Sequence, residues 1–201
     1  MKCIFEEDIK QINNFEELEE QIKRCRICKN LFSPNPLVFG NKDAKIVQIG
    51  QAPSQNASET NTFFNDESGK RLRNEWYEIT DEEFYNPDNF YILPLAHCFP
   101  GKNKYGHDNN PPKICFEKWG KNELNLIDNE IYIILGAKAA KKIFPDKKFE
   151  ELVFTDSIYN GKKTYVLPHP SPLNNRWLKK HPEFIQKRMP EIRKEIKKVL
   201  K

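Results

Sequence analysis

Four short apolar runs, accompanied by helical patterns, limit the folds open to this sequence. The runs are rich in β-branched and aromatic residues, as is typical of buried parallel strands. Strands that alternate with helices predict an α/β fold with a doubly wound sheet. The apolar runs occupy residues 44–49, 90–95, 131–135 and 164–167. The helical patterns occupy residues 15–24, 68–78, 113–126, 137–143 and 182–200, where Pro190 is expected to bend or interrupt the last helix.

We expect residues 1–201 to form a single domain, because the chain has no internal repeat, low-complexity linker or break in composition. An apolar fraction of 38% and a mean hydropathy of −0.78 argue against a membrane protein. No apolar run approaches the ~20 residues that cross a bilayer. The opening residues, MKCIFEEDIKQ, lack the apolar stretch of a signal peptide. These features predict a cytoplasmic protein, and we expect it to be a monomer.

The basic residues gather near the C-terminus, although the net charge of the chain is only +4. Residues 176–201 hold ten lysines and arginines against three glutamates. A solvated helix face explains such a pattern. An edge that faces the phosphates of a nucleic acid explains it as well, and the sequence leaves both interpretations open.

Ligands of doubly wound sheets bind where the parallel strands end, so the segments after the four runs are candidate sites. Three of these segments are dense in glycine, proline, histidine and asparagine. Prolines around His169 fix the backbone and hold its imidazole at a strand end. An imidazole placed there can donate a hydrogen bond to an oxyanion that develops on a leaving group. The segments are residues 50–54, 97–101, 136–140 and 168–174.

Two phenylalanines, Phe63 and Phe64, precede a carboxylate at Asp66. One interpretation is local, because Asp66 or Ser68 can cap the helix that follows. The other is chemical, because a flipped-out base needs an aromatic face and polar groups that read its edge. Hydrolysis of an N-glycosidic bond also needs a carboxylate or amide that orients water.

Four of the five cysteines, Cys25, Cys28, Cys98 and Cys115, indicate a metal centre. A C-x2-C pair points two thiolates at one ion or cluster, and a disulfide framework is not expected without secretion. Four thiolates suit tetrahedral zinc or an iron–sulfur cluster. The absence of a second C-x2-C pair favours a [4Fe–4S] cluster. Buried free thiols are the other explanation, and Cys3 stands outside the pattern.

Taken together, these segments resemble the iron–sulfur branches of the uracil-DNA glycosylase superfamily, called family 4 and family 5. The motif G-x-A-P-x is present at residues 50–54, and H-P-S-P-x-N at residues 169–174. The four cysteines and the turn at residues 136–140 follow the same pattern. The resemblance implies a three-layer α/β/α sandwich around a central four-stranded parallel sheet. It also implies a structural [4Fe–4S] cluster on the four cysteines, with zinc as the alternative.

The same resemblance implies an enzyme that acts on DNA. Its reaction is the hydrolysis of the N-glycosidic bond of uracil, or of another deaminated or modified base. The product is an abasic site, as in base-excision repair.

The catalytic residues that the resemblance implies are Asp66, which activates water, His169, which stabilises the leaving base, and Gln51. The residues that bind the base are Gly50, Ala52, Pro53, Asn65 and the pair Phe63 and Phe64, one of which stacks on it. The residues that contact DNA are Ser54, Ser171, Pro172, Leu173, Asn174 and Arg176, with Leu173 as an apolar wedge.

Two positions depart from family 4. Gln51 stands where that family has a glutamate, so the water-activating role passes to Asp66, which resembles a downstream aspartate of family 5. Pro94 stands where family 4 has an asparagine that reads the base. Gln51, Asn56 or Asn65 is left to supply an amide, and the sequence does not choose among them. The identity of the excised base therefore stays open.

Two alternatives belong to the same fold. A non-catalytic DNA-binding module uses the same pocket without bond cleavage, and the departures at Gln51 and Pro94 motivate it. A module that traps its product covalently uses a histidine in an insertion equivalent to residues 101–110. His107 lies in that insertion but lacks the basic run that precedes the trapping histidine.

Overall fold

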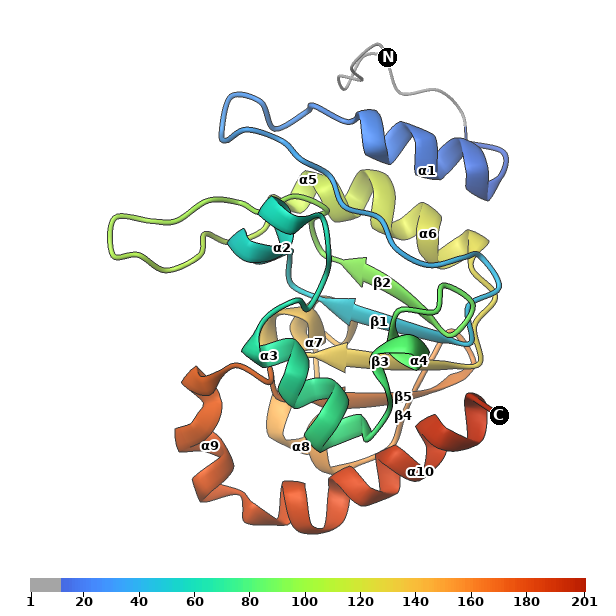
Figure 1. Ribbon diagram of the computed structural model, residues 1–201, viewed down its shortest axis with the longest axis vertical. Coiled ribbons are helices and arrows are strands. Elements are labelled where there is room, and N and C mark those ends of the chain that lie inside the picture. The colour runs from blue at the N-terminus through green and yellow to red at the C-terminus, as the bar shows by residue number, and fades with distance from the viewer. Residues whose placement is uncertain (1–11) are drawn as a thin grey trace.

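The computed structural model describes residues 12–201 and consists of a β-sheet with helices on both faces (Figure 1). Cys3 and the expected absence of a signal peptide concern residues 1–11, which lie outside the described part. The strand order is β2-β1-β3-β5-β4. In Figure 1, helix α3 (Glu67–Lys70) lies in front of the sheet and helix α7 (Ala137–Ile143) lies behind it. The predicted α/β sandwich is confirmed.

Four parallel strands form where the apolar runs predict them. Strand β1 pairs with β2 and with β3, and β3 pairs with β5, all in parallel. Helices flank the sheet, so almost every residue of β1, β2 and β3 is buried. Burial on both faces explains why these strands are continuous apolar runs. The strands are β1 (Ile46–Gly50), β2 (Phe90–Pro94), β3 (Ile131–Leu135) and β5 (Lys162–Leu167).

The prediction of a four-stranded, wholly parallel sheet is wrong by one strand. A short strand β4 (Ser157–Tyr159) pairs antiparallel with β5. The two strands are joined by Asn160 and Gly161, whose φ angles of 47° and 75° form a tight hairpin turn. Ile158 in this strand is exposed, so three residues at a sheet edge give no apolar run that the sequence pattern can detect.

Two predicted helices, α1 (Phe15–Arg24) and α7, are confirmed with the expected bounds. The other three are each interrupted by a π-helical segment. In the last of them the π-helical segment ends at Arg188, just before Pro190, and α10 continues through the proline. Residues 68–78 form α3 and η2 (Arg71–Tyr77); residues 113–126 form α5 (Lys113–Cys115), η3 (Phe116–Gly120) and α6 (Lys121–Leu126); residues 182–200 form η5 (Phe184–Arg188) and α10 (Met189–Val199).

The sequence patterns miss five short helical elements. They are α2 (Gln55–Thr60), α4 (Asp81–Phe84), α8 (Phe149–Phe154), η4 (Pro172–Asn174) and α9 (Asn175–Lys180).

Within residues 12–201, no helix combines the length and the apolar character that crossing a membrane requires.

The basic side chains of α10 lie away from the carboxyl ends of the parallel strands. Arg193 and Lys197 both pair with Glu78, at 2.5 and 3.2 Å. In Figure 1 the strand arrowheads point to the left, whereas α10 ends on the right beside the C-terminus. This placement favours the solvated-face interpretation for α10. Arg176, by contrast, lies in α9 on the left of the same view.

Candidate active site

A pocket at the carboxyl ends of the parallel strands joins segments that are far apart in the sequence. It is lined by residues 50–54, by part of residues 63–68 and by His169, with Ile92 and Leu135 from the strands. The pocket therefore lies where the rule for parallel sheets places candidate sites. Nine of the predicted site residues line the pocket: Gly50, Gln51, Ala52, Pro53, Ser54, Phe63, Phe64, Asp66 and His169.

The loop after β1 is fixed at both of its ends. The backbone N–H of Leu95 donates to the carbonyl oxygen of Gly50 at 2.9 Å, which continues the sheet pairing beyond the strands. At the other end, the hydroxyl of Ser54 accepts from the backbone N–H of Ala57 at 3.2 Å and caps α2. The loop is therefore tied to a strand and a helix while its residues face the pocket.

Phe64 holds an unusual backbone conformation at the pocket wall. Its φ angle is 55°, which is disfavoured for a bulky residue. Two contacts stabilise it: Arg73 Nη1 donates to its carbonyl oxygen at 2.9 Å, and its ring packs edge-on against Phe84 at 5.9 Å between centroids. Phe63 is only 6% exposed and belongs to the core, so Phe64 offers more surface to a ligand.

Gly69 makes the position of Phe64 possible, and this leads to a testable expectation. A Cβ at position 69 would lie 1.7 Å from the carbonyl oxygen of Phe64. We expect Gly69→Ala to displace Phe64 and to lower the free energy of unfolding by about 1–3 kcal/mol, as overpacking does. Urea unfolding measures the change. Glu67→Ala in the same helix is the control, and equal midpoints for the two variants would contradict this role of Gly69.

Asp66 combines a helix-cap contact with a place in the pocket lining. Its Oδ1 accepts from the backbone N–H of Gly69 at 2.9 Å and caps α3, so the cap interpretation is confirmed for this residue. Ser68 does not cap the helix but lines the pocket. Because a carboxylate has two oxygens, the cap leaves Asp66 Oδ2 free to accept a proton or a hydrogen bond in the pocket.

His169 is placed as a hydrogen-bond donor to the pocket. Its Nδ1 accepts from the backbone N–H of Ser171 at 3.2 Å, so the proton of the neutral ring lies on Nε2. Burial lowers the pKa of His169 below its ordinary value, and the charges of Asp66 and Asp108 oppose that shift. Asn174 Nδ2 donates to the carbonyl oxygen of His169 at 2.7 Å and fixes the loop that follows.

A groove of about 450 Å³ adjoins the pocket and shares His169 with it. Leu173 at its edge is 85% exposed, which suits an apolar wedge. Arg71 Nη1 anchors this segment by donating to the carbonyl oxygen of Pro170 at 3.1 Å and to Asn175 Oδ1 at 2.9 Å. Four predicted DNA-contacting residues line the groove: Ser54, Ser171, Leu173 and Asn174.

Three predicted residues line neither the pocket nor the groove: Asn65, Pro172 and Arg176. Asn56 is also directed elsewhere, because its Nδ2 donates to the carbonyl oxygen of Asn65. Of the amides considered, Gln51 is the one that the described structure brings into the pocket. Sequence reasoning did not assign several lining residues, namely Ala57, Ser68, Ile92 and Leu135 in the pocket, and Pro100, Lys102, Gly106, Asp108 and Lys138 in the groove.

The sequence model of the uracil DNA glycosylase superfamily matches residues 37–193. The chain belongs to the uracil DNA glycosylase superfamily. The matched span contains every segment that lines the pocket. Among solved structures, a candidate uracil DNA glycosylase from Methanosarcina acetivorans is similar at 14% identity and a TM-score of 0.42. That match covers 77% of this chain and 96% of the other.

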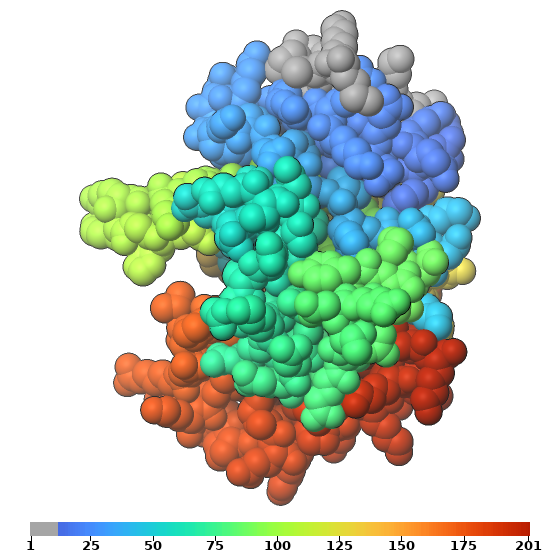
Figure 2. Space-filling view, in the orientation of Figure 1, coloured from blue at the N-terminus to red at the C-terminus, as the bar shows by residue number. Residues whose placement is uncertain are grey.

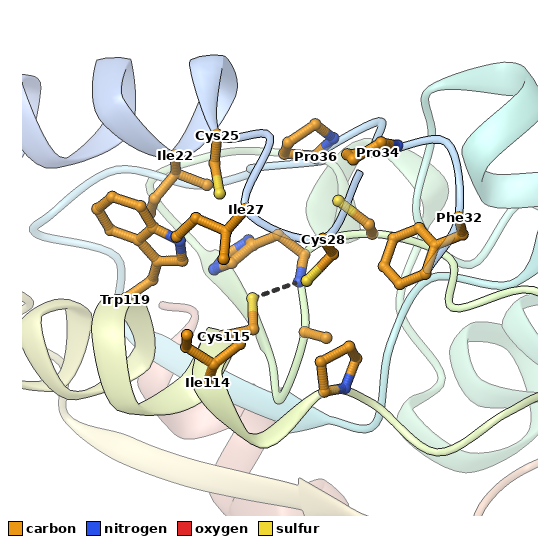
Figure 3. Close-up of a pocket in the computed structure, with 14 residues that line it drawn as sticks. Ile22, Cys25, Ile27, Cys28, Phe32, Pro34, Pro36, Ile114, Cys115 and Trp119 are labelled. Atoms are coloured by element: carbon orange, nitrogen blue, oxygen red, sulfur yellow. Dashed lines mark hydrogen bonds between the residues drawn. The ribbon is translucent and has the colours of Figure 1, made fainter. Parts of the chain in front are cut away.

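The four predicted metal ligands of this glycosylase-superfamily chain line one apolar cavity (Figure 3). Cys25 and Cys28 follow α1, Cys98 follows β2, and Cys115 ends α5. Ile22, Ile27 and Trp119 are among the apolar side chains around them (Figure 3). Within residues 12–201, no three side chains of histidine, cysteine, aspartate or glutamate are arranged to hold a metal ion. The four thiols therefore line one cavity, and they form no ready-made ion site in the described part of the chain.

The environment of these thiols disfavours their charged forms. Burial raises the pKa of Cys98 to about 12 and raises the pKa of Cys115 well above its ordinary value. The pKa of Cys28 is shifted in the same direction, also by burial. At Cys98 the effect of burial outweighs the opposing charge of Arg26. These three groups are therefore neutral thiols at pH 7, and a metal centre that binds them displaces their protons.

A buried polar network positions two of the cysteines, Cys98 and Cys115. The backbone N–H of His97 donates to Cys115 Sγ at 3.4 Å (Figure 3). The His97 ring bonds the carbonyl oxygen of Leu37 at 2.8 Å and Glu123 Oε2 at 3.0 Å. Tyr91 donates to Glu123 Oε1 at 2.6 Å. The network ties β2, the loop that carries Cys98, and α6 together.

Proposed function

We propose that this protein is a DNA glycosylase that hydrolyses the N-glycosidic bond of uracil, or of another deaminated base, and leaves an abasic site. One observation carries the proposal: Phe64, Asp66 and His169, from separate segments, line the same pocket. An aromatic face, a carboxylate and a neutral imidazole are what base flipping and glycosidic cleavage require. DNA is then the partner, and the activity belongs to intracellular repair by a monomer.

The residues take distinct roles in the reaction. The flipped-out base stacks on Phe64, with Phe63 behind it. As the bond from C1′ to the base nitrogen breaks, its electron pair passes to the base, and His169 Nε2–H donates to the oxygen that gains charge. Water attacks C1′ and loses its proton towards Asp66 Oδ2, which orients it. The loop that carries Gln51 places that water on the opposite side of the sugar from the leaving base.

The base is recognised without the asparagine that family 4 places on β2. Pro94 lines the pocket and offers no side-chain hydrogen bond, so Gln51 is our candidate for reading the base edge. A cleavage assay tests both the activity and the substrate. Labelled oligonucleotides that each carry one uracil, hypoxanthine, xanthine or modified cytosine are incubated with the protein and treated with alkali. Scission at one or more of these bases supports the proposal, and no scission from folded protein favours the non-catalytic module.

Asp66→Asn separates the chemical role of Asp66 from its structural role. Asparagine caps a helix about as well as aspartate, so we expect the free energy of unfolding to change by less than about 0.5 kcal/mol. The amide does not accept the proton of water, so the single-turnover rate should fall by about 10²–10⁴-fold. The control is Glu67→Gln, which removes a neighbouring exposed carboxylate. Equal rates for the two variants would remove Asp66 from the mechanism.

We also propose that Cys25, Cys28, Cys98 and Cys115 hold a [4Fe–4S] cluster with a structural role. Four thiols around one apolar cavity support this assignment, and a zinc ion is the alternative. Bound to the four thiolates, the cluster would link segments that are distant in sequence, and no step of the excision reaction needs it. Its removal is therefore expected to lower the stability of the fold.

A further inference from the structure

The segment after β2 forms a hairpin that projects from the body of the molecule (Figures 1 and 2). Its two sides pair through Lys102 and Asp108. Backbone N–H groups of Asn109 and Asn103 donate to the carbonyl oxygens of Gly101 and His107, at 2.9 and 2.8 Å. The hairpin is therefore held in one shape by its own hydrogen bonds, although it is almost entirely exposed.

The hairpin forms one wall of the groove beside the pocket. Lys102, His107 and Asp108 line one side of this groove, and the segment with Leu173 lines the other. In Figure 2 a recess separates the projecting hairpin, in yellow-green, from the orange segment that follows His169. Asp108 is near enough to raise the pKa of His169 against the effect of burial. The hairpin thus reaches the candidate active site itself.

Positive charge lines this groove, and an aromatic ring lies in the turn of the hairpin, outside the groove lining. Lys102 and Lys138 both line the groove and are exposed, and neither forms an ion pair with a carboxylate in the described chain. Tyr105, in the turn of the hairpin, is 72% exposed, and Lys104 Nζ lies 5.0 Å from its ring centroid. Unpaired lysines bind phosphates, and exposed aromatic rings stack on bases.

We propose that this groove is a second nucleotide subsite, in which Lys102 and Lys138 bind phosphates next to the target nucleotide and Tyr105 stacks on a neighbouring base. The inference rests on the proposed function, because it assigns the groove to the same DNA strand that enters the pocket. The groove is continuous with the pocket through residues 51–54 and His169, which line both. A strand whose target base occupies the pocket must continue past its rim. The hairpin and Leu173 then hold that strand from two sides.

The lysines are tested by DNA binding, which does not depend on cleavage. Fluorescence anisotropy measures the affinity for a labelled single-stranded oligonucleotide that carries a stable abasic-site analogue. In Lys102→Ala/Lys138→Ala we expect the slope of log Kd against log salt to fall by about 1.4, or ~0.7 for each phosphate that a lysine no longer neutralises. The control, Lys194→Ala/Lys198→Ala, removes the same charge from α10 on the other side of the molecule. Equal slopes for the two double variants would overturn the proposal.

Tyr105 is tested by replacement with alanine and with phenylalanine. Stacking needs the ring but not the hydroxyl, so Tyr105→Phe should bind like the wild type and Tyr105→Ala about tenfold more weakly. Oligonucleotides with 2-aminopurine at successive positions beside the abasic analogue report the stacking as fluorescence quenching. Loss of quenching at one position in Tyr105→Ala supports the subsite, and unchanged quenching at every position overturns it.

These experiments distinguish failure of the subsite from failure of the proposed function. The subsite predicts that Lys102→Ala/Lys138→Ala weakens DNA binding and lowers its salt dependence, whether or not the protein excises a base. Asp66→Asn should instead show normal binding and slow excision. If the protein excises no base, the salt-dependence and quenching measurements still decide whether the groove is a nucleotide subsite.

Discussion

Replacing His169 with alanine should slow base excision by about 10²–10³-fold at saturating DNA. The expectation follows from a donor that is fixed before the reaction: Ser171 N–H occupies Nδ1, so Nε2–H is presented to the pocket. A donor held in place in a buried site stabilises the charge of the leaving base without reorganising. Alanine leaves that charge with no side-chain partner at position 169. Single-turnover kinetics on the best substrate of the base panel measures the loss.

A second histidine provides the control for this variant. His181 stacks on Trp177 at 4.3 Å between centroids and lines neither the pocket nor the groove. We expect His181→Ala to keep the wild-type excision rate when equal concentrations of folded protein are compared. A fall of less than about fivefold in His169→Ala would contradict the oxyanion role, because a single hydrogen bond to a charged group is worth more than that.

The lowered pKa of His169 also fixes the sign of a pH effect on stability. Unfolding restores an ordinary pKa of about 6.5, so the unfolded chain binds the proton more readily. The contribution of the neutral ring is therefore present above about pH 6.5 and is lost as the pH falls through the lower, folded-state value. The wild type should lose more unfolding free energy than His169→Ala between about pH 7.5 and 5. Urea unfolding at both pH values measures this, and equal losses would contradict it.

The fold was predictable wherever burial left a periodic or continuous pattern in the sequence. Strand β3 and helix α7 have the expected bounds because one is buried along its whole length and the other has a clear apolar face. Strand β4 has neither property, since its three residues lie at an edge. The short helix α4 begins at a capping box on Thr80 and Glu83, a local signal that apolar periodicity does not detect.

The candidate site was predictable to the extent that strand ends determine it. Residues 50–54 and His169 follow directly from the rule for parallel sheets, and the structure brings them together. The direction of each side chain in the intervening segment was not predictable. Phe64 adopts a positive φ, and the next residue, Asn65, lies outside the pocket lining. Lys102 and Lys138 lie in segments that the sequence singled out, residues 101–110 and 136–140, but nothing in the sequence distinguishes them from other surface lysines.

Loss of one cysteine ligand should remove the cluster and destabilise the whole chain. In Cys115→Ala we expect iron and the brown colour to be lost, because a [4Fe–4S] cluster needs four protein ligands here. The four cysteines lie at the end of α1, in the loop after β2 and in α5. The proposed cluster would therefore close long loops as a cross-link does. A cross-link over such loops is worth about 3–5 kcal/mol, which corresponds to a Tm lower by about 10 °C in a chain of this size.

The control for Cys115→Ala is Cys3→Ala, which removes the cysteine outside the predicted set. It should retain the iron content, the broad absorbance towards the blue and the Tm of the wild type. If the wild-type protein is colourless and contains one zinc ion, the four cysteines bind zinc, the alternative metal, in place of the cluster. Iron-free protein with an unchanged Tm would refute the structural role, because the apolar walls formed by Ile22, Ile27 and Trp119 would then hold these segments without any metal.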